Sequence, residues 1–137
     1  MVPLETAPSD LQDFAARYTA AWCRQDASRV ASFFTASGSL SVNGGAPAVG
    51  RLAIQGVAQS FMSAFPDLRV VFEKLVSTDD RAEYHWTLVG TNTGPGGAGR
   101  PVRISGMERW ALAPDGLIAS SDGQFDAVDY QRQVGPP

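Results

Sequence analysis

Two carboxylates in the second half of the chain, Glu108 and Asp122, are the residues whose type and setting best suit proton-transfer chemistry. Both fall on predicted strands, in which successive side chains point to opposite faces of a sheet. A carboxylate can remove a proton from a carbon next to a carbonyl when burial raises its pKa and the substrate lies against it. The alternatives are an ion pair of Glu108 with Arg103 or Arg51, and an exposed or structural Asp122.

The single histidine and the single cysteine are weaker candidates for chemistry. His85 lies between Tyr84 and Trp86 on a predicted strand, so it belongs to the opposite face, and we expect it to point outward or into a dimer interface. Cys23 follows Trp22 on a predicted helix and is interpreted as a buried or half-buried structural thiol. A His/Cys metal site has too few ligands to close. We therefore predict neither a metal nor a cofactor.

Helical spacing of apolar residues predicts three helices in the first half of the chain. They span residues 9–25, the stretch from an N-cap at Asp26 to a stop at Gly38, and residues 51–65, with a short strand at 39–43 before the third. Ser9 followed by Gln12 is a capping-box pattern and predicts the start of the first helix. These helices would present their apolar stripes to a common core.

Alternating polarity and turn residues predict four long strands in the second half. They span residues 68–77, 81–93, 101–112 and 117–126, and a helical turn to about Gln133 follows them. The glycine-rich run 94–99 lacks the lysine and the following helix of a phosphate-binding loop, so we interpret it as a hairpin loop near the pocket mouth. Helices followed by an antiparallel meander predict an α+β fold in which the helices cover one face of the sheet.

Length and composition indicate one globular domain over residues 1–137, with residues 1–8 and 134–137 expected to fray. Of the 137 residues, 44% are hydrophobic and 18% charged, which argues against disorder. The net charge of −3 offers no basic surface for nucleic acid. The sequence shows neither a secretory signal pattern nor an apolar run of roughly 18 residues that could cross a membrane. We therefore expect a cytoplasmic protein.

Several short motifs follow one another along nearly the whole chain. They are Gln25-Asp26-Ala27 after a helix ending near Trp22, Gly50-Arg51, Ala64-Phe65-Pro66-Asp67-Leu68, His85-Trp86-Thr87, Gly90-Thr91-Asn92-Thr93-Gly94, Asp115-Gly116-Leu117-Ile118 and Gln133-Val134-Gly135. In this order they resemble the SnoaL-like polyketide cyclases of the nuclear transport factor two superfamily. The resemblance implies a cone-shaped, curved antiparallel sheet packed against about three N-terminal helices, enclosing a pocket.

The resemblance also implies which strand face lines the pocket, namely the one carrying Asn92, Glu108 and Asp122. Family members use an aspartate on the last strand as acid/base, and Asp122 is the nearest match. Tyr18, Asn92 and Gln124 would then donate hydrogen bonds to a developing enolate oxygen. Two departures stand out: Asn92 replaces a frequent histidine, and Ser120-Ser121-Asp122-Gly123 replaces a tryptophan–aspartate pair.

Three tryptophans would supply flat apolar walls for a ligand: Trp22, Trp86 and Trp110. The competing interpretation places these rings, and Tyr18, in the hydrophobic core.

The function implied by the resemblance is a cofactor-independent cyclase or isomerase acting on a hydrophobic carbonyl compound. One alternative is a small-molecule binding protein without chemistry. The other is an epoxide hydrolase, which needs two aspartates flanking an arginine, whereas Arg109 alternates away from Glu108. A homodimer is also expected, with His85, Arg103 and Arg109 as candidate interface residues.

Overall fold

The computed structural model describes residues 5–135, which form seven strands and four helices around one sheet. The helices are α1 (Ser9–Cys23), α2 (Ala27–Ser32), α3 (Arg51–Ala64) and α4 (Ala127–Val134). The strands are β1 (Glu5–Thr6), β2 (Phe34–Val42), β3 (Ala48–Val49), β4 (Arg69–Thr78), β5 (Arg81–Thr91), β6 (Pro101–Leu112) and β7 (Ile118–Phe125). None of the helices within residues 5–135 is long and apolar enough to cross a membrane.

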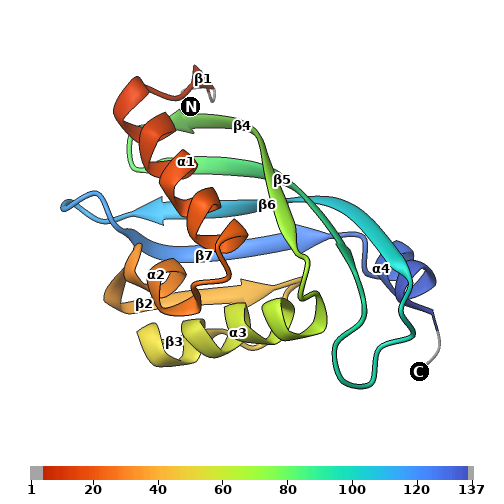
Figure 1. The fold of residues 1–137 in the computed structure, drawn as a ribbon. Helices are drawn as coiled ribbons and strands as arrows, with labels where there is room; N and C mark the ends of the chain where they lie inside the picture. The colour runs from red at the N-terminus through yellow and green to blue at the C-terminus, as the bar shows by residue number, and fades with distance from the viewer. Residues whose placement is uncertain (1–4, 136–137) are drawn as a thin grey trace.

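The strands form a curved sheet in the order β1-β4-β5-β6-β7-β2-β3 (Figure 1). The meander from β4 to β7 is antiparallel, which confirms the α+β class predicted from the sequence. β2 joins this meander by pairing in parallel with β7, a contact between segments about eighty residues apart. The predicted antiparallel meander is confirmed, and the parallel β2–β7 pair adds to it; pairing between such distant segments leaves no local pattern in the sequence.

Helices α1, α2 and α3 lie across one face of the sheet, and α4 lies beside the ends of β6 and β7 (Figure 1). The apolar stripe of α1 is buried at Ala15, Tyr18 and Ala21, and α3 buries Ile54 and Met62. A core of aromatic and aliphatic side chains fills the space between these helices and the sheet. This packing buries one face of the central strands and leaves their other face more exposed to solvent.

The helix boundaries show where local patterns decide the structure and where they do not. Asp26 caps α2 as predicted, because its carboxylate accepts a hydrogen bond from the backbone N–H of Arg29 at 3.0 Å. The capping box at Ser9 is wrong: Pro8 precedes α1, and the amide of Gln12 donates to the carbonyls of Ala7 and Leu75 instead.

The second helix is shorter than predicted, and the strand after it begins earlier. α2 ends at Ser32, and Phe34 already pairs with Ile118 in the sheet. Phe33 and Phe34 fit a helical stripe, but pairing with β7 overrides that local preference. The predicted fraying of the termini is also incomplete: residues 5–6 pair with β4 and α4 extends to Val134, while residues 1–4 and 136–137 lie outside the described part of the chain.

Candidate active site

A mostly apolar cavity of about 70 Å³ lies between the sheet and the helices. Its lining comes from α1, β2, α3, β4, β5, β6, β7 and α4: Trp22, Leu40, Val42, Val57, Phe61, Val70, Tyr84, Trp86, Leu88, Ile104, Glu108, Gly123, Phe125 and Tyr130. Among these residues, Glu108 is the one with a carboxyl group. A single acidic group in apolar surroundings makes this cavity the candidate active site.

Three donors hold the carboxyl group of Glu108. The hydroxyl of Ser121 donates to Oε1 at 2.7 Å, and the indole N–H of Trp110 donates to the same oxygen at 3.0 Å. The hydroxyl of Tyr18 lies 3.1 Å from both carboxyl oxygens. Oε1 therefore has three donors within reach and Oε2 has one, so Oε2 is the oxygen with more capacity to bind a substrate proton.

Burial raises the pKa of Glu108 above its ordinary value of 4.5. The cause is desolvation, which disfavours the charged carboxylate, and the hydrogen bonds from Ser121, Trp110 and Tyr18 oppose it only in part. Burial, and then the nearby charge of Glu108, also raise the pKa of the Tyr18 hydroxyl well above its ordinary range. Tyr18 is therefore a neutral hydrogen-bond donor to Glu108.

Strand register and packing against α1 fix the surroundings of Glu108. Tyr84 on β5 and Gly123 on β7 are its direct partners across the sheet. The ring of Tyr84 stacks on that of Trp110, with centroids 5.0 Å apart, and its hydroxyl lies 2.6 Å from the hydroxyl of Thr19 on α1. These contacts tie the sheet to α1 at the level of the carboxyl group.

A second close packing places the indole of Trp86 in the cavity. Trp86 pairs with Gly106 on β6, and a Cβ at Gly106 would lie 2.5 Å from the Trp86 ring. Only glycine leaves room for this ring, because any other residue would displace it. Gly106 therefore shapes the wall on which a ligand would lie.

Several residues selected from the sequence lie at the cavity. Glu108, Trp22 and Trp86 line it. Tyr18 and Trp110 are buried in the core behind Glu108 and reach its carboxyl group by hydrogen bonds. That these residues act on or bind a substrate stays a prediction.

Asp122 and Gln124 do not lie at the cavity, and the predicted convergence of Asp122 with Glu108 is wrong. Gly123 is the partner of Glu108, so the residues on either side of it point to the opposite face, where both are exposed. The carboxylate of Asp122 accepts a hydrogen bond from the hydroxyl of Ser41, and its neighbour across the sheet is Arg109.

Asn92 also lies away from the cavity. It follows the end of β5, and its backbone bonds to Gly99 and Arg100 in the glycine-rich hairpin loop. Its side chain packs beside Gly97, where a Cβ would lie 2.6 Å from the side-chain amide oxygen of Asn92. The hairpin itself is confirmed.

The remaining predictions concern the positions of His85, Cys23 and Arg51. His85 points to the opposite face as predicted and lies 3.4 Å from Glu83. Cys23 is exposed, which corrects its interpretation as a buried or half-buried thiol; its sulfur bonds to the backbone N–H and carbonyl of Val70 at the edge of β4. The ion pair of Glu108 with Arg51 does not form, because the Arg51 Nε donates to the carbonyl of Phe34 at 3.0 Å.

Ser121 is the site residue that the sequence analysis missed. A bulge in β7 explains why: Ala111 pairs with Ser120 and Leu112 with Ile118, which leaves Ala119 without a partner. An extra residue inverts the alternation, so Ser121 rather than Ser120 shares the face of Ile118. The sequence does carry a sign of the extra residue. The apolar residues at the two ends of the strand, Ile118 and Phe125, are an odd number of positions apart, so a regular strand would place them on opposite faces.

The fold is that of ketosteroid isomerase-like and nuclear transport factor two-like proteins. Residues 15–121 match the SnoaL-like domain family, and the chain belongs to that family. None of the curated proteins matches this sequence.

Solved structures with 16–19% identity share the fold. A protein with a ketosteroid isomerase-like fold from Catenulispora acidiphila DSM 44928, in complex with trimethylamine, has 18% identity and a TM-score of 0.80; the match covers 91% of this chain and 94% of that protein. SalBIII, an epoxide hydrolase/cyclase-like enzyme of pyran ring formation in the polyether salinomycin, has 19% identity and a TM-score of 0.75, with coverage of 88% and 93%. A protein from Jannaschia sp. CCS1 described as a SnoaL-like polyketide cyclase has 16% identity and a TM-score of 0.76, with coverage of 97% and 100%.

Proposed function

We propose that the protein is a small acid–base enzyme of the cyclase or isomerase type, which binds a hydrophobic carbonyl compound in the cavity and uses Glu108 to move a proton. One observation carries this proposal: the carboxyl group of Glu108 lies in an apolar cavity, where burial raises its pKa. A raised pKa brings a carboxylate closer to the value that suits general base catalysis near neutral pH.

The proposed step is the transfer of one proton. The Glu108 carboxylate, through Oε2, takes a proton from the carbon next to the substrate carbonyl, and the electron pair of that C–H bond becomes an enolate. Glu108 then holds the proton as a carboxylic acid and returns it to another carbon or to oxygen, which completes an isomerisation or follows ring closure. Tyr18, Trp110 and Ser121 are positioning residues, because their hydrogen bonds hold the carboxyl group in place.

The rate should rise with pH. A base must be ionised to act, so activity should be low at pH 4.5 and should increase as pH passes upward through the raised pKa of Glu108. A protein that uses Glu108 as the acid in its limiting step would show the opposite slope.

Hydrogen exchange at carbon tests this step before the natural substrate is known. Cyclohexanone in D₂O reports proton removal next to its carbonyl by NMR, and the wild-type protein should accelerate this exchange. Glu108→Gln should lower the catalysed exchange rate by about 100-fold or more, because general base catalysis contributes about that much. Asp122→Asn, which alters a carboxylate on the other face, is the matched control and should exchange like the wild type. Equal rates for wild type and Glu108→Gln would overturn the proposal.

A binding protein without chemistry is the second candidate. The observation that favours it is the engagement of Glu108 by three donors, as expected of a satisfied buried group. Such a protein would bind a ligand without turnover, and Glu108→Gln would leave every measured rate at the buffer value.

The epoxide hydrolase alternative loses its main support. It needs an arginine in the cavity, but the side chain of Arg109 is 59% exposed on the other face and lies 3.8 Å from Glu83. The likeness to SalBIII, at 19% identity, concerns the fold alone.

A further inference from the structure

We propose that α4 is a lid over the cavity, closed by the ring of Tyr130 and fastened by the side chain of Gln133. This inference rests on the proposed function, since a lid matters only if the cavity takes a ligand.

The cavity is too small for the ligand class that its lining suits. Its volume of about 70 Å³ is well below the roughly 150 Å³ of an engineered cavity that binds benzene. A hydrophobic carbonyl compound with even one ring therefore needs one wall to move. The question is which wall can move at the least cost in broken contacts.

Most walls are held firmly. Tyr84, Trp86 and Leu88 lie on β5, which is paired along its length with β4 on one side and β6 on the other. The carboxyl group of Glu108 is fixed by three donors. Phe61 lies on α3, the 14-residue helix that packs on α2 and β2. Moving any of these would break a ladder or a helix packing.

The wall formed by α4 is different. This helix has eight residues and contributes Tyr130 to the lining. The Tyr130 ring packs edge-on against Phe125 and Phe65, with centroid distances of 5.4 and 6.4 Å. These apolar contacts can separate without leaving a buried polar group unpaired, so they permit opening.

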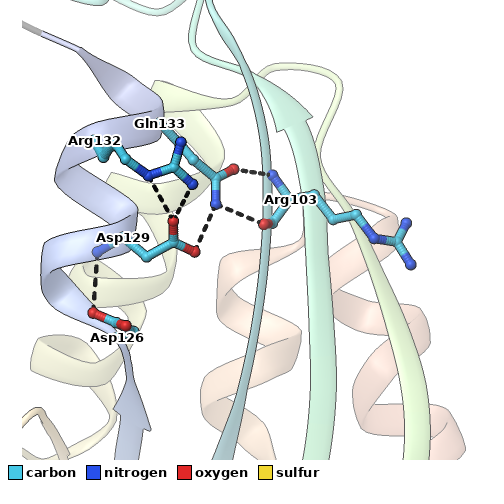
Figure 2. A network of polar contacts seen from close by, with 5 residues as sticks. All are labelled: Arg103, Asp126, Asp129, Arg132 and Gln133. Carbon is cyan, nitrogen blue, oxygen red and sulfur yellow. Dashed lines mark hydrogen bonds and ion pairs between the residues drawn. The ribbon is translucent and has the colours of Figure 1, made fainter.

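Gln133 joins α4 to the sheet (Figure 2). Its carbonyl oxygen accepts a hydrogen bond from the backbone N–H of Arg103 at 2.7 Å, and its amide nitrogen donates to the Arg103 carbonyl at 2.9 Å. Pairing of β7 with β6 ends at Gly106, so this one side chain supplies the two bonds that a neighbouring strand would make to Arg103. Within residues 5–135, these are the side-chain hydrogen bonds that link α4 to the rest of the molecule.

The remaining polar contacts of α4 stay within the helix and would move with it (Figure 2). Asp129 bonds to Arg132 and to the amide of Gln133, and Asp126 caps the helix through the N–H of Asp129. The Asp129 bond orients the Gln133 amide toward Arg103. Opening therefore requires the loss of two hydrogen bonds at Gln133, of the Tyr130 contacts and of the packing of Val134, the one buried residue of α4, against the core.

Amide hydrogen exchange tests the lid without a ligand. Gln133→Ala should raise the exchange of the α4 amides about ten-fold, because two hydrogen bonds to the sheet are lost and an eight-residue helix that leaves the sheet does not keep its own hydrogen bonds. Gln133→Glu places a carboxylate against Asp129 and the Arg103 carbonyl in place of the amide donor, so it should also raise the exchange. Gln131→Ala, at an exposed position on the same helix, should match the wild type. Equal exchange in wild type and Gln133→Ala would overturn the lid.

Stopped-flow binding of the fluorescent naphthyl ketone prodan tests the same lid with a ligand. Gln133→Ala should bind and release the dye about ten-fold faster. Tyr130→Ala should bind it faster still, while Tyr130→Phe, which keeps the ring, should behave like the wild type. Dye kinetics unchanged by Gln133→Ala and Tyr130→Ala would count against the lid. A wild-type protein that binds no dye would count against the proposed function, and the exchange experiment would still decide on the lid.

Discussion

The two faces of the central strands each carry a glutamate, but the two carboxyl groups have different surroundings. On the face toward the helices, Glu108 is 7% exposed and accepts hydrogen bonds from Tyr18, Trp110 and Ser121. On the opposite face, Glu83 is 25% exposed and lies near His85 and Arg109. Burial among aromatic rings disfavours the charged form of Glu108 and raises its pKa. The difference shows that position on the strand, and not residue type, determines which carboxylate suits acid–base chemistry.

The largest difference in stability is expected between variants of two neighbouring residues on β6. Trp110→Ala removes a ring that is 1% exposed, stacked on Tyr84 and bonded to Glu108, and should destabilise the protein by about 3–5 kcal/mol. Arg109→Ala removes a mostly exposed side chain with one weak ion pair and should change the free energy of unfolding by less than about 1 kcal/mol. Urea denaturation of both variants measures the difference. Similar losses for the two would mean that the faces are not distinct.

A smaller difference in stability is expected between variants of two neighbouring residues on β7. Ser121→Ala removes the 2.7 Å bond to Glu108 and leaves that oxygen with fewer donors, which should cost about 1–3 kcal/mol. It should also raise the pKa of Glu108 further, because the Ser121 bond lowers it. Ser120→Ala, at a half-exposed position facing the other way, should stay within about 0.5 kcal/mol of the wild type. The reverse order in thermal or urea unfolding would contradict the register of β7.

The sequence predicted what depends on neighbouring residues. The N-cap at Asp26 was confirmed because the capping bond is local. The strand over residues 101–112 was confirmed with its bounds, and alternation along it correctly grouped Glu108 with Gly106 and Trp110. These features follow from the period of a strand and from turn residues on either side.

The sequence did not predict what depends on distant contacts. The face of Asp122 follows from the bulge at Ala119, which pairing with β6 creates, and the parallel β2–β7 pair joins segments far apart in the chain. The place of Tyr130 depends on how α4 returns to the sheet through Gln133. The opposite parity of Ile118 and Phe125 indicates that a residue is inserted somewhere in the strand, but only the pairing with β6 places it at Ala119, and the shift moves every later side chain to the other face.

The most direct test of the account is the pKa of Glu108 itself. Carbon-13 NMR of the side-chain carboxyl groups, with Glu108→Gln to assign the signal, gives its titration midpoint in the folded protein. We predict a midpoint above the ordinary 4.5, because burial in the apolar cavity outweighs the hydrogen bonds from Ser121, Trp110 and Tyr18. A midpoint at or below 4.5 would mean that these donors stabilise a permanent carboxylate, and it would contradict the assignment of Glu108 as the acid–base group.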